Sequence, residues 1–320
     1  MEKVKVALIG AGAMANSVHY PSLAEMADVQ MVALCDLVPE KREETALRFG
    51  IPRTYSDYRE MVQKENPDAV YVLMPPYHLF DAAVYCLQQG KHVFVEKPPA
   101  VTTFQTLELA NWAEAKACVT QIGFNRRYIP LLVKVREMQR EAGDLNLAVS
   151  TFYKAQPDAL YYNGAIDVLH CDAIHAVDAL RWMGGDVVAV GSHVSGSGET
   201  PRLNRWLAVM EFEDGGSGVL LTNWDSGTRV HTFEMHAPGF AAFVNPDADG
   251  QAVVHRPGKD PLTITSVEAA GSDQWHKVYG FFGESRNFID CIKAGVDSDC
   301  SFADAARSMA LADDILAGMI

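Results

Sequence analysis

A glycine-rich turn directly after the first apolar run constrains the fold more than any other feature of this 320-residue sequence. Residues 4–9 are almost continuously apolar, as in a parallel strand that is buried on both faces. The turn that follows reads GAGAMA over residues 10–15 and matches the pattern G-x-G-x-x-A. In that pattern the first glycine allows a tight turn, the second lets a pyrophosphate approach the backbone, and the small third residue lets a helix pack on the strand. The pattern predicts that the chain opens with a dinucleotide-binding βαβ unit.

An acidic residue follows this turn at the distance that a bound dinucleotide requires. Residues 13–26 have helical spacing, and residues 29–35 form a second apolar run that ends at Asp36, about 20 residues beyond the turn. A carboxylate in this position can accept hydrogen bonds from an adenosine ribose. No arginine directly follows Asp36 to meet the 2′-phosphate of NADP, so we expect NAD, although Lys41 or Arg42 could accommodate NADP. A structural glycine turn in another kind of α/β protein is the alternative.

Strands and helices continue to alternate up to residue 123. We expect further strands at 69–74, 92–95 and 119–123, and helices at 39–49, 79–89 and 103–116. Parallel strands are usually joined by a right-handed crossover helix, so this alternation predicts a doubly wound parallel sheet. We therefore expect an N-terminal dinucleotide-binding Rossmann domain over residues 1–123.

The pattern changes after residue 123 to long β-rich stretches. Helical spacing covers residues 128–141, and two closing helices are expected at 281–293 and 302–319. The β-rich stretches lie at 146–154, 187–194, 206–212, 218–223 and 232–236. Loops rich in Gly, Ser and Asp connect them, as in antiparallel hairpins. We predict a second domain over residues 124–320, an α+β domain with a large, mostly antiparallel open sheet that binds substrate and mediates oligomerisation.

Charge and cysteine content exclude several classes of protein. Lys and Arg number 27 against 41 Asp and Glu, a net charge of −14 that would repel nucleic acid and anionic membrane surfaces. None of the six cysteines has CxxC spacing, so we expect buried thiols rather than a zinc site or a disulfide framework. The N-terminus runs directly into the first strand, without a signal peptide or an apolar span of about 20 residues. We therefore expect a cytoplasmic protein with no membrane or nucleic-acid partner.

Several short motifs along the chain match one known family. The segment GKHVFVEKP at residues 90–98 places a lysine at the carboxyl end of an expected strand, where ligands of open α/β sheets bind. Other motifs are MPP at 74–76, GFNRRYIP at 123–130, HAVD at 175–178 and FGE at 282–284. With the GAGAMA turn, they make the whole chain resemble the Gfo/Idh/MocA family of NAD(P)-dependent sugar and polyol oxidoreductases. The resemblance implies a Rossmann domain followed by an open-sheet α/β domain, a carbohydrate or polyol substrate, and a homodimer or homotetramer.

The resemblance also implies which side chains carry the chemistry. It places Lys97 close to the nicotinamide and the substrate hydroxyl, and it assigns exchange of the hydroxyl proton to a histidine of the second domain. An imidazole, with an ordinary pKa of about 6.5, suits proton transfer at neutral pH. The resemblance favours His175 over His170 for this role, because the residues that follow His175, at 177–178 and 180–184, match those after the family's histidine. Many family members carry an aspartate four residues before this histidine, where this chain has Cys171. Asp172, about 60° around a helix from His175, is the carboxylate that we expect to orient it.

The remaining site predictions follow from the same motifs. The predicted cofactor contacts are Gly10, Gly12, Ala13, Met14, Ala15, Asp36, Pro75, His78, Glu96 and Lys97. The predicted substrate contacts are Lys97, Arg127, Tyr162, Asp172 and His175, and Tyr162 is preferred over Lys154, Tyr161, Asn163 and Trp224. A zinc site at His170, Asp172 and His175 is an alternative, but nothing else in the sequence supplies a fitting ligand. We therefore expect no metal.

These observations leave three functions open. The main hypothesis is an oxidoreductase that transfers hydride between a nicotinamide and a secondary alcohol or ketone of a sugar, polyol or sugar derivative. The same groups could instead use tightly held NAD+ to oxidise a sugar transiently, eliminate a glycosidic substituent and return the hydride, as a redox-neutral lyase or glycosidase. The third hypothesis is a non-catalytic NAD(P)-binding sensor, against which the presence of Lys97 and His175 argues.

Overall fold

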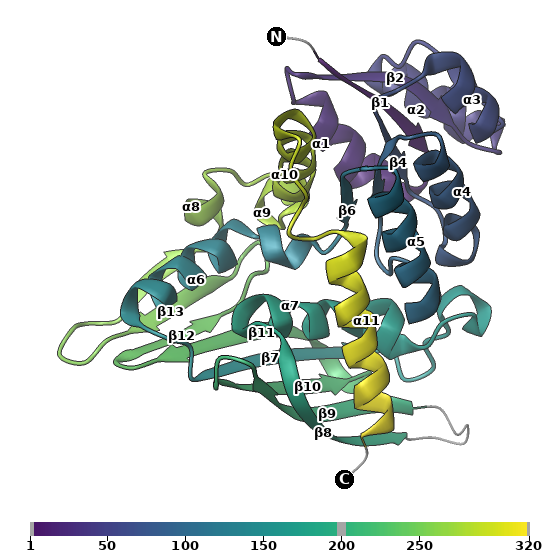
Figure 1. Ribbon diagram of the computed structural model, residues 1–320. Helices are drawn as coiled ribbons and strands as arrows, with labels where there is room; N and C mark the ends of the chain where they lie inside the picture. Colours follow the sequence, from purple (N-terminus) through teal and green to yellow (C-terminus); the bar gives the residue numbers. More distant parts are fainter. Residues whose placement is uncertain (1–2, 197–202, 319–320) are drawn as a thin grey trace. The chain divides into compact units, whose positions relative to one another are not determined.

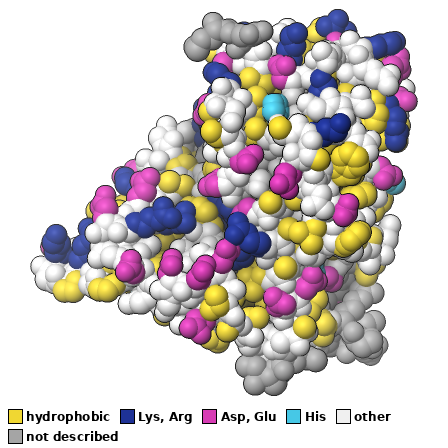
Figure 2. Space-filling model, viewed as in Figure 1, with side chains coloured by type: hydrophobic (Ala, Val, Ile, Leu, Met, Phe, Trp, Pro, Cys, Tyr) yellow, Lys and Arg dark blue, Asp and Glu magenta, His cyan; other side chains and the backbone are white. Residues whose placement is uncertain are grey.

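The chain forms two compact units in the computed structural model, which describes residues 3–196 and 203–318 (Figure 1). The first unit comprises Met1–Asn125 and Phe281–Ala306, and the second comprises Arg126–Gly280 and Arg307–Ile320. Within the described ranges, none of the helices combines the length and the apolar character that a membrane span needs. Acidic and basic side chains are interspersed on the face drawn in Figure 2, and no single basic patch covers that face.

A six-stranded parallel sheet forms the centre of the first unit. Its strands are β1 (Val4–Ile9), β2 (Val29–Cys35), β3 (Thr54–Tyr55), β4 (Ala69–Val72), β5 (His92–Val95) and β6 (Thr120–Ile122), in the order β3-β2-β1-β4-β5-β6. The helices are α1 (Tyr20–Ala24), which a π-helical turn at Ala15–His19 precedes, α2 (Pro39–Phe49), α3 (Tyr58–Glu65), α4 (Pro76–Gln88), α5 (Thr103–Ala115) and α10 (Phe281–Ala294). This strand order is that of dinucleotide-binding Rossmann folds, so the predicted fold class of this part is confirmed. The order reverses between β1 and β4, where ligands of such sheets bind beyond the carboxyl ends of the strands.

The strands of this sheet read as nearly continuous apolar runs because they are buried on both faces. Every residue of β4 and most residues of β1 are buried. Tyr71 of β4 and Phe94 of β5 stack with ring centroids 4.4 Å apart, and Phe288 of α10 meets the Tyr71 ring edge-on at 5.7 Å. This core fixes the carboxyl ends of β1, β4 and β5, which carry the residues described below.

One helix near the C-terminus belongs to the first unit, whereas the sequence predicts that residues 124–320 form the second domain. Phe288 of this helix, α10, is fully buried in the core of the Rossmann sheet. Arg286 and Lys293 on the same helix bind Asp28, at 2.7 and 2.6 Å, and these hydrogen bonds lower the pKa of the Asp28 carboxyl. The helix packs there because its apolar stripe covers the open core and its two cations meet one carboxylate.

An eight-stranded sheet forms the centre of the second unit. Its strands are β7 (Leu147–Ala155), β8 (Val187–Gly196), β9 (Leu203–Phe212), β10 (Ser217–Asn223), β11 (Asp225–Ala237), β12 (Phe240–Val244), β13 (Gln251–His255) and β14 (Leu262–Thr265), in the order β14-β13-β12-β11-β7-β10-β9-β8. Strands β7 and β10 pair in parallel, and every other neighbouring pair is antiparallel. The predicted large, mostly antiparallel sheet is therefore confirmed, and β12 to β14 extend it beyond the five stretches that the sequence predicts.

Helices cover one face of this sheet (Figure 1). Helix α6 (Pro130–Ala142) packs on β11, β12 and β13, and α7 (Ile174–Gly184) packs on β7 and β10. The short helices α8 (Ser266–Ala270) and α9 (Trp275–Val278) follow the sheet, and α11 (Phe302–Ala317) closes the chain. The predicted end of this last helix, Met319, lies outside the described residues. Alternate residues of β9 such as Phe212 are buried, whereas Leu207 and Val209 on the opposite face are exposed, so one face of the sheet carries exposed apolar side chains.

Replacing Phe288 with alanine should destabilise the first unit, because its core loses a large ring with no exposed surface. The expected loss is about 3–5 kcal/mol of unfolding free energy. Urea titration followed by hydrogen–deuterium exchange in peptides of β1 and β4 measures this loss for the first unit alone. The matched control is Asp290→Ala on the exposed side of the same helix, where loss of the ion pair with Arg286 should cost less than about 1 kcal/mol. Equal effects of the two substitutions would show that α10 lies outside this core.

Candidate active site

A cavity of about 640 Å³ opens in the first unit at the carboxyl ends of β1 and β2. Five predicted cofactor contacts line it: Gly10, Gly12, Asp36, Pro75 and His78. The other lining residues are Ile9, Cys35, Leu37, Val38, Lys41, Ser56, Asp57, Tyr58, Arg59, Leu73 and Met74. A concave site of this volume, with apolar walls and a few polar groups, is typical of cofactor and small-molecule sites.

The two glycines of the turn have different roles. Gly10 has φ +108°, and a Cβ there would lie 2.3 Å from the carbonyl oxygen of Leu73, so only glycine fits between the ends of β1 and β4. At Gly12 a Cβ would have no atom within 4 Å, so the backbone borders open space that a phosphate can approach. The first N–H groups of a helix, together with its dipole, favour an anion at this position. The turn therefore fits the pyrophosphate of a dinucleotide.

The three residues after Gly12 begin the helix that follows the turn. Ala15 is buried, as the small third residue of the pattern requires for close packing on the strand. Met14 is 47% exposed, and Ala13 is exposed as well. Their backbone N–H groups lie in the first turn of the helix, where a bound phosphate would accept hydrogen bonds.

Asp36 lies at the end of β2, beside the glycine turn. Its Oδ2 accepts a hydrogen bond from the Ala11 N–H at 2.7 Å, and its Oδ1 accepts one from the Val38 N–H at 2.8 Å. These bonds fix the carboxylate in the wall of the cavity, and a carboxylate has further lone pairs to offer ribose hydroxyls. Lys41 lines the same cavity, whereas the Arg42 guanidinium donates to the Asp36 carbonyl oxygen at 3.0 Å.

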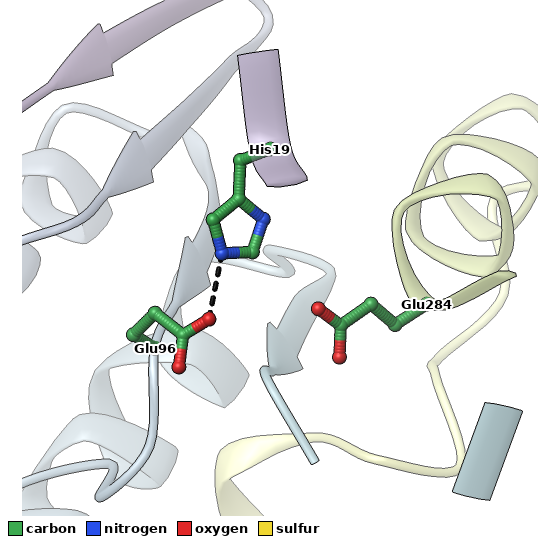
Figure 3. Close-up of side chains that lie close together, drawn as sticks. All are labelled: His19, Glu96 and Glu284. Atoms are coloured by element: carbon green, nitrogen blue, oxygen red, sulfur yellow. Dashed lines mark hydrogen bonds and ion pairs between the residues drawn. The ribbon is translucent and has the colours of Figure 1, made fainter. Parts of the chain in front are cut away.

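Glu96 and Lys97 follow β5 and do not line this cavity. Lys97 is partly buried, and its backbone N–H donates to Glu96 Oε2 at 3.1 Å. Glu96 Oε1 lies 2.6 Å from His19 Nε2 (Figure 3). The Glu96 carboxylate thus serves contacts within the first unit, and a direct cofactor contact for it stays a prediction.

Asp172 is a buried residue in a partly buried polar cluster of the second unit. Its Oδ2 accepts hydrogen bonds from the Tyr161 hydroxyl, at 2.5 Å, and from the Lys154 ammonium. The Tyr161 hydroxyl also accepts a hydrogen bond from the Trp224 indole N–H at 3.3 Å. Burial and the negative charge of Asp172 raise the pKa of the Tyr161 hydroxyl, which therefore keeps its proton at neutral pH. The cluster combines a carboxylate, an ammonium and a phenol, groups that form hydrogen bonds with hydroxyl-bearing ligands.

His175 follows this cluster on α7 and is buried. Asp172 precedes it in a π-helical turn, Leu169–Ala173, so the regular helical spacing that the sequence suggests does not apply between them. One turn further along, Asp178 forms a bidentate ion pair with Arg127, at 2.8 Å from Nε and 2.5 Å from Nη2. Both of these side chains are buried. Arg127 therefore anchors α7, and its substrate contact stays a prediction.

His170, the histidine that the resemblance does not favour, lies between two carboxylates. Its Nδ1 is 2.8 Å from Asp167 Oδ2, and its Nε2 is 3.1 Å from Asp313 Oδ1. Burial lowers the pKa of His170, but the hydrogen bonds and charges of the two carboxylates outweigh it and raise that pKa above its ordinary value. His170 thus ties the turn before α7 to α11. His170, Asp172 and His175 are the residues of the alternative zinc site. In the part of the chain that the structure describes, the ligand atoms of these three side chains do not come close enough together to share a metal ion.

Two residues of the Asp172 cluster differ from those that the sequence favours. The sequence favours Tyr162, which has φ +51° and is 38% exposed, whereas the hydroxyl of its neighbour Tyr161 contacts Asp172. Tyr161 and Tyr162 lie in an irregular loop, where side chains follow no regular alternation. The sequence therefore does not indicate which of the two tyrosines points toward Asp172. For Lys154 a signal exists, because it continues the alternate positions of β7 that include the buried Phe152.

The two glycines should respond differently to substitution by alanine. Gly10→Ala forces a Cβ against the Leu73 carbonyl and should lower the melting temperature strongly or prevent folding. Gly12→Ala meets no atom within 4 Å and should leave the melting temperature nearly unchanged, but it should weaken dinucleotide binding about tenfold, or about 1.4 kcal/mol. Thermal melts and NADH fluorescence titrations measure both effects. Unchanged NADH affinity in Gly12→Ala would mean that the pyrophosphate binds elsewhere.

Replacing His170 with asparagine should cost more stability at about pH 6 than at about pH 9. The folded-state pKa of His170 is raised, so its stabilising contribution is complete below the unfolded pKa of about 6.5 and is lost as the pH rises through the folded-state value. Both partner carboxylates are about half exposed, so this contribution should be about 1 kcal/mol. Chemical denaturation of both proteins across this range measures the difference. Equal losses at the two pH values would contradict the ion-pair role.

Comparison with known proteins agrees with the geometry of the first unit. Residues 4–124 match the model of a family described as an oxidoreductase family with an NAD-binding Rossmann fold. D-glucoside 3-dehydrogenase of Escherichia coli (strain K12) is 31% identical over 134 residues, which are 42% of this chain and 38% of that protein. Inositol 2-dehydrogenase/D-chiro-inositol 3-dehydrogenase of Lactiplantibacillus plantarum is 26% identical over 188 residues, which are 57% of this chain and 53% of that protein. The chain thus matches about half or less of the length of these relatives.

Solved structures share the fold over nearly the whole chain. A dehydrogenase from Chromobacterium violaceum has a TM-score of 0.89 at 22% identity, over 100% of this chain and 96% of that one. A levoglucosan dehydrogenase in complex with NADH has a TM-score of 0.86 at 21% identity, over 99% of this chain and 97% of that one. Residues 4–124 therefore carry the NAD-binding Rossmann fold of the Gfo/Idh/MocA oxidoreductase family, and the whole chain shares the fold of these solved dehydrogenases.

Proposed function

We propose that the protein is an NAD-dependent dehydrogenase that transfers hydride between nicotinamide and a secondary alcohol or ketone of a sugar, polyol or sugar derivative. The observation that carries this proposal is the partly buried cluster of Asp172, Lys154 and Tyr161 in the second unit. Its carboxylate, ammonium and phenol suit a ligand rich in hydroxyl groups rather than an apolar one. Such an enzyme also needs a site for the dinucleotide, and the cavity of the first unit supplies one.

Oxidation of a secondary alcohol removes a hydride from the carbinol carbon and a proton from its oxygen. Bound NAD+ supplies the acceptor for the hydride, at C4 of the nicotinamide ring. We assign the proton to the imidazole of His175, which is suited to proton transfer at neutral pH. The ammonium of Lys97 would stabilise the negative charge that develops on the substrate oxygen. Asp172, held in place by Lys154 and Tyr161, would bind a substrate hydroxyl and orient the imidazole.

The names of the relatives support the substrate class. They specify D-glucoside and inositol dehydrogenases, and a neighbour in fold was crystallised with NADH and levoglucosan. We carry the class over to this chain and leave the particular sugar or polyol to experiment. The exposed Leu207 and Val209 on one face of the large sheet support a homodimer or homotetramer, and sedimentation of a single 35.1 kDa species would contradict it. A cytoplasmic location stays a prediction from the sequence.

The proposed use of NAD rather than NADP predicts a selective effect at Asp36. Asp36→Ala removes a carboxylate that would bind the ribose hydroxyls of NAD, so NAD affinity should fall by about 1.5–3 kcal/mol. NADP affinity should fall less or rise, because the same carboxylate repels a 2′-phosphate. Fluorescence titrations with both reduced cofactors measure the two dissociation constants. An equal loss for both would refute the ribose role of Asp36.

The experiment that tests the function offers purified protein NAD+ or NADP+ together with inositols, aldoses, uronates and glycosides. Accumulation of reduced cofactor in proportion to a consumed alcohol supports the proposal and identifies the substrate and the cofactor together. A glycoside that disappears while no NADH accumulates would replace the proposal with the redox-neutral lyase or glycosidase. Cofactor binding without turnover of any of these compounds would favour the sensor.

Once a substrate is known, Lys97→Ala should lower kcat about 10²-fold, the scale expected for loss of charge stabilisation and acid–base assistance. The dissociation constant of the cofactor should change little, because Lys97 lies outside the lining of the dinucleotide cavity. The control is Lys91→Ala, which removes an ammonium that binds Asn66 on the opposite end of β5. Steady-state kinetics compare the variants, and a near-normal kcat in Lys97→Ala would exclude Lys97 from the chemistry.

A further inference from the structure

A histidine and two glutamates lie together in the first unit, outside the lining of the cofactor cavity (Figure 3). His19 ends the π-helical turn that follows the glycine turn, Glu96 follows β5, and Glu284 lies on α10. The candidate ligand atoms of the three side chains lie within 4.8 Å of one another, and His19 and Glu284 are fully buried. Such a cluster is either a site for a metal ion or a hydrogen-bonded network.

The distance between two of these atoms favours a hydrogen bond. His19 Nε2 and Glu96 Oε1 are 2.6 Å apart. Two ligands of one zinc ion, each about 2.0–2.2 Å from the metal in tetrahedral geometry, would stand about 3.4 Å apart. A separation of 2.6 Å is instead that of a strong hydrogen bond to a carboxylate. The imidazole therefore donates and the Glu96 carboxylate accepts.

Glu96 uses its second oxygen toward Lys97. Glu96 Oε2 accepts the Lys97 N–H at 3.1 Å, so one carboxylate connects the His19 imidazole with the backbone of Lys97. Gly123 lies close beside this carboxylate, since a Cβ built there would be only 3.2 Å from its carbon and from both its oxygens. The imidazole is also confined, since its ring packs edge-on against Phe94 at 5.3 Å. The connection is therefore a fixed one.

This connection joins the two parts of the first unit that the proposed function requires. His19 belongs to the helical segment that begins at the glycine turn, where the pyrophosphate would bind, and Glu96 holds the backbone from which Lys97 projects. We propose that His19 and Glu96 are positioning residues for Lys97: the imidazole fixes the carboxylate, and the carboxylate fixes the lysine backbone relative to the cofactor turn. This inference rests on the proposed dehydrogenase function, in which Lys97 acts on the substrate.

Kinetics of three His19 variants test the role. His19→Leu removes the hydrogen-bond donor, and His19→Asn keeps a polar group that is too short to reach Glu96. Both should lower kcat about 10- to 100-fold, the scale expected when a catalytic group is misplaced. The KM for the cofactor should change little. His19→Gln, whose amide nitrogen falls close to the position of Nε2, should restore most of the lost kcat. Equal kcat losses in all three variants would overturn the inference.

A second measurement does not depend on turnover. In the full-length protein labelled with ¹⁵N-lysine, the Lys97 amide resonance is identified by its loss in Lys97→Arg. It should move in His19→Leu and His19→Asn and return in His19→Gln, because it reports the hydrogen bond to Glu96. The matched control is His92→Leu, which removes a histidine at the far end of β5 that accepts the Val119 N–H at 2.9 Å. A Lys97 resonance that stays in place in His19→Leu would overturn the inference.

Two further outcomes separate this inference from its alternatives. If no sugar or polyol is turned over but the Lys97 resonance moves as described, the proposed function fails while the positioning network is supported. Metal analysis of the purified protein tests the other reading of the cluster. About one equivalent of a divalent metal, lost in Glu284→Gln, would overturn the inference, because that substitution leaves His19 and Glu96 in place and removes only the third potential ligand.

Discussion

The close approach of Gly10 to the Leu73 carbonyl is the constraint on which the rest of the first unit depends. With φ +108° and no Cβ, Gly10 lets the ends of β1 and β4 meet at the point where the strand order reverses. The buried Tyr20 hydroxyl donates to the Gly10 carbonyl at 2.9 Å and holds the turn from the following helix. The glycines of this turn line the cofactor cavity. The helical segment that follows the turn ends at His19, whose imidazole contacts Glu96. One backbone contact thus orders the dinucleotide site and the residues behind Lys97.

Most of the fold is predictable because the two sheets impose different periods on the sequence. Strands buried on both faces read as short apolar runs, and strands with one covered face alternate, so β1, β4 and β9 can be assigned to their sheets from sequence alone. The two-residue β3 is too short to show either period. The docking of α10 is not predictable for another reason. An apolar stripe shows that a helix is buried, but the partner surface is fixed by contacts such as those of Arg286 with Asp28, far apart in sequence.

The residues of the candidate site also fall into two groups: some are predictable from local sequence spacing, and others depend on contacts between segments that are far apart in sequence. The positions of the glycine turn and Asp36 are predictable because they follow from spacing within one βαβ unit, and both line one cavity of the structure. The choice of Tyr161 over Tyr162 and the ion pair of Lys154 with Asp172 depend on how an irregular loop and a π-helical turn fold against β7. Glu96 shows what local spacing leaves out: its carboxylate contacts the imidazole of a histidine 77 positions earlier in the chain, and no local pattern predicts that pair.

The proposed chemistry explains why the buried charges of the second unit are paired before any substrate arrives. A buried carboxylate without partners is costly, so Asp172 is stabilised by Lys154 and Tyr161, and Asp178 is stabilised by Arg127. A substrate hydroxyl that joins the Asp172 cluster therefore meets groups whose positions are already set, and little ordering cost remains at binding. An analogue that lacks this hydroxyl would displace water from the cluster without replacing its hydrogen bonds, which is how a polar site rejects such a ligand. In the proposed dehydrogenase, substitutions around Asp172 would change the preferred substrate, while the cofactor cavity, which lies within the other unit, would keep its lining residues.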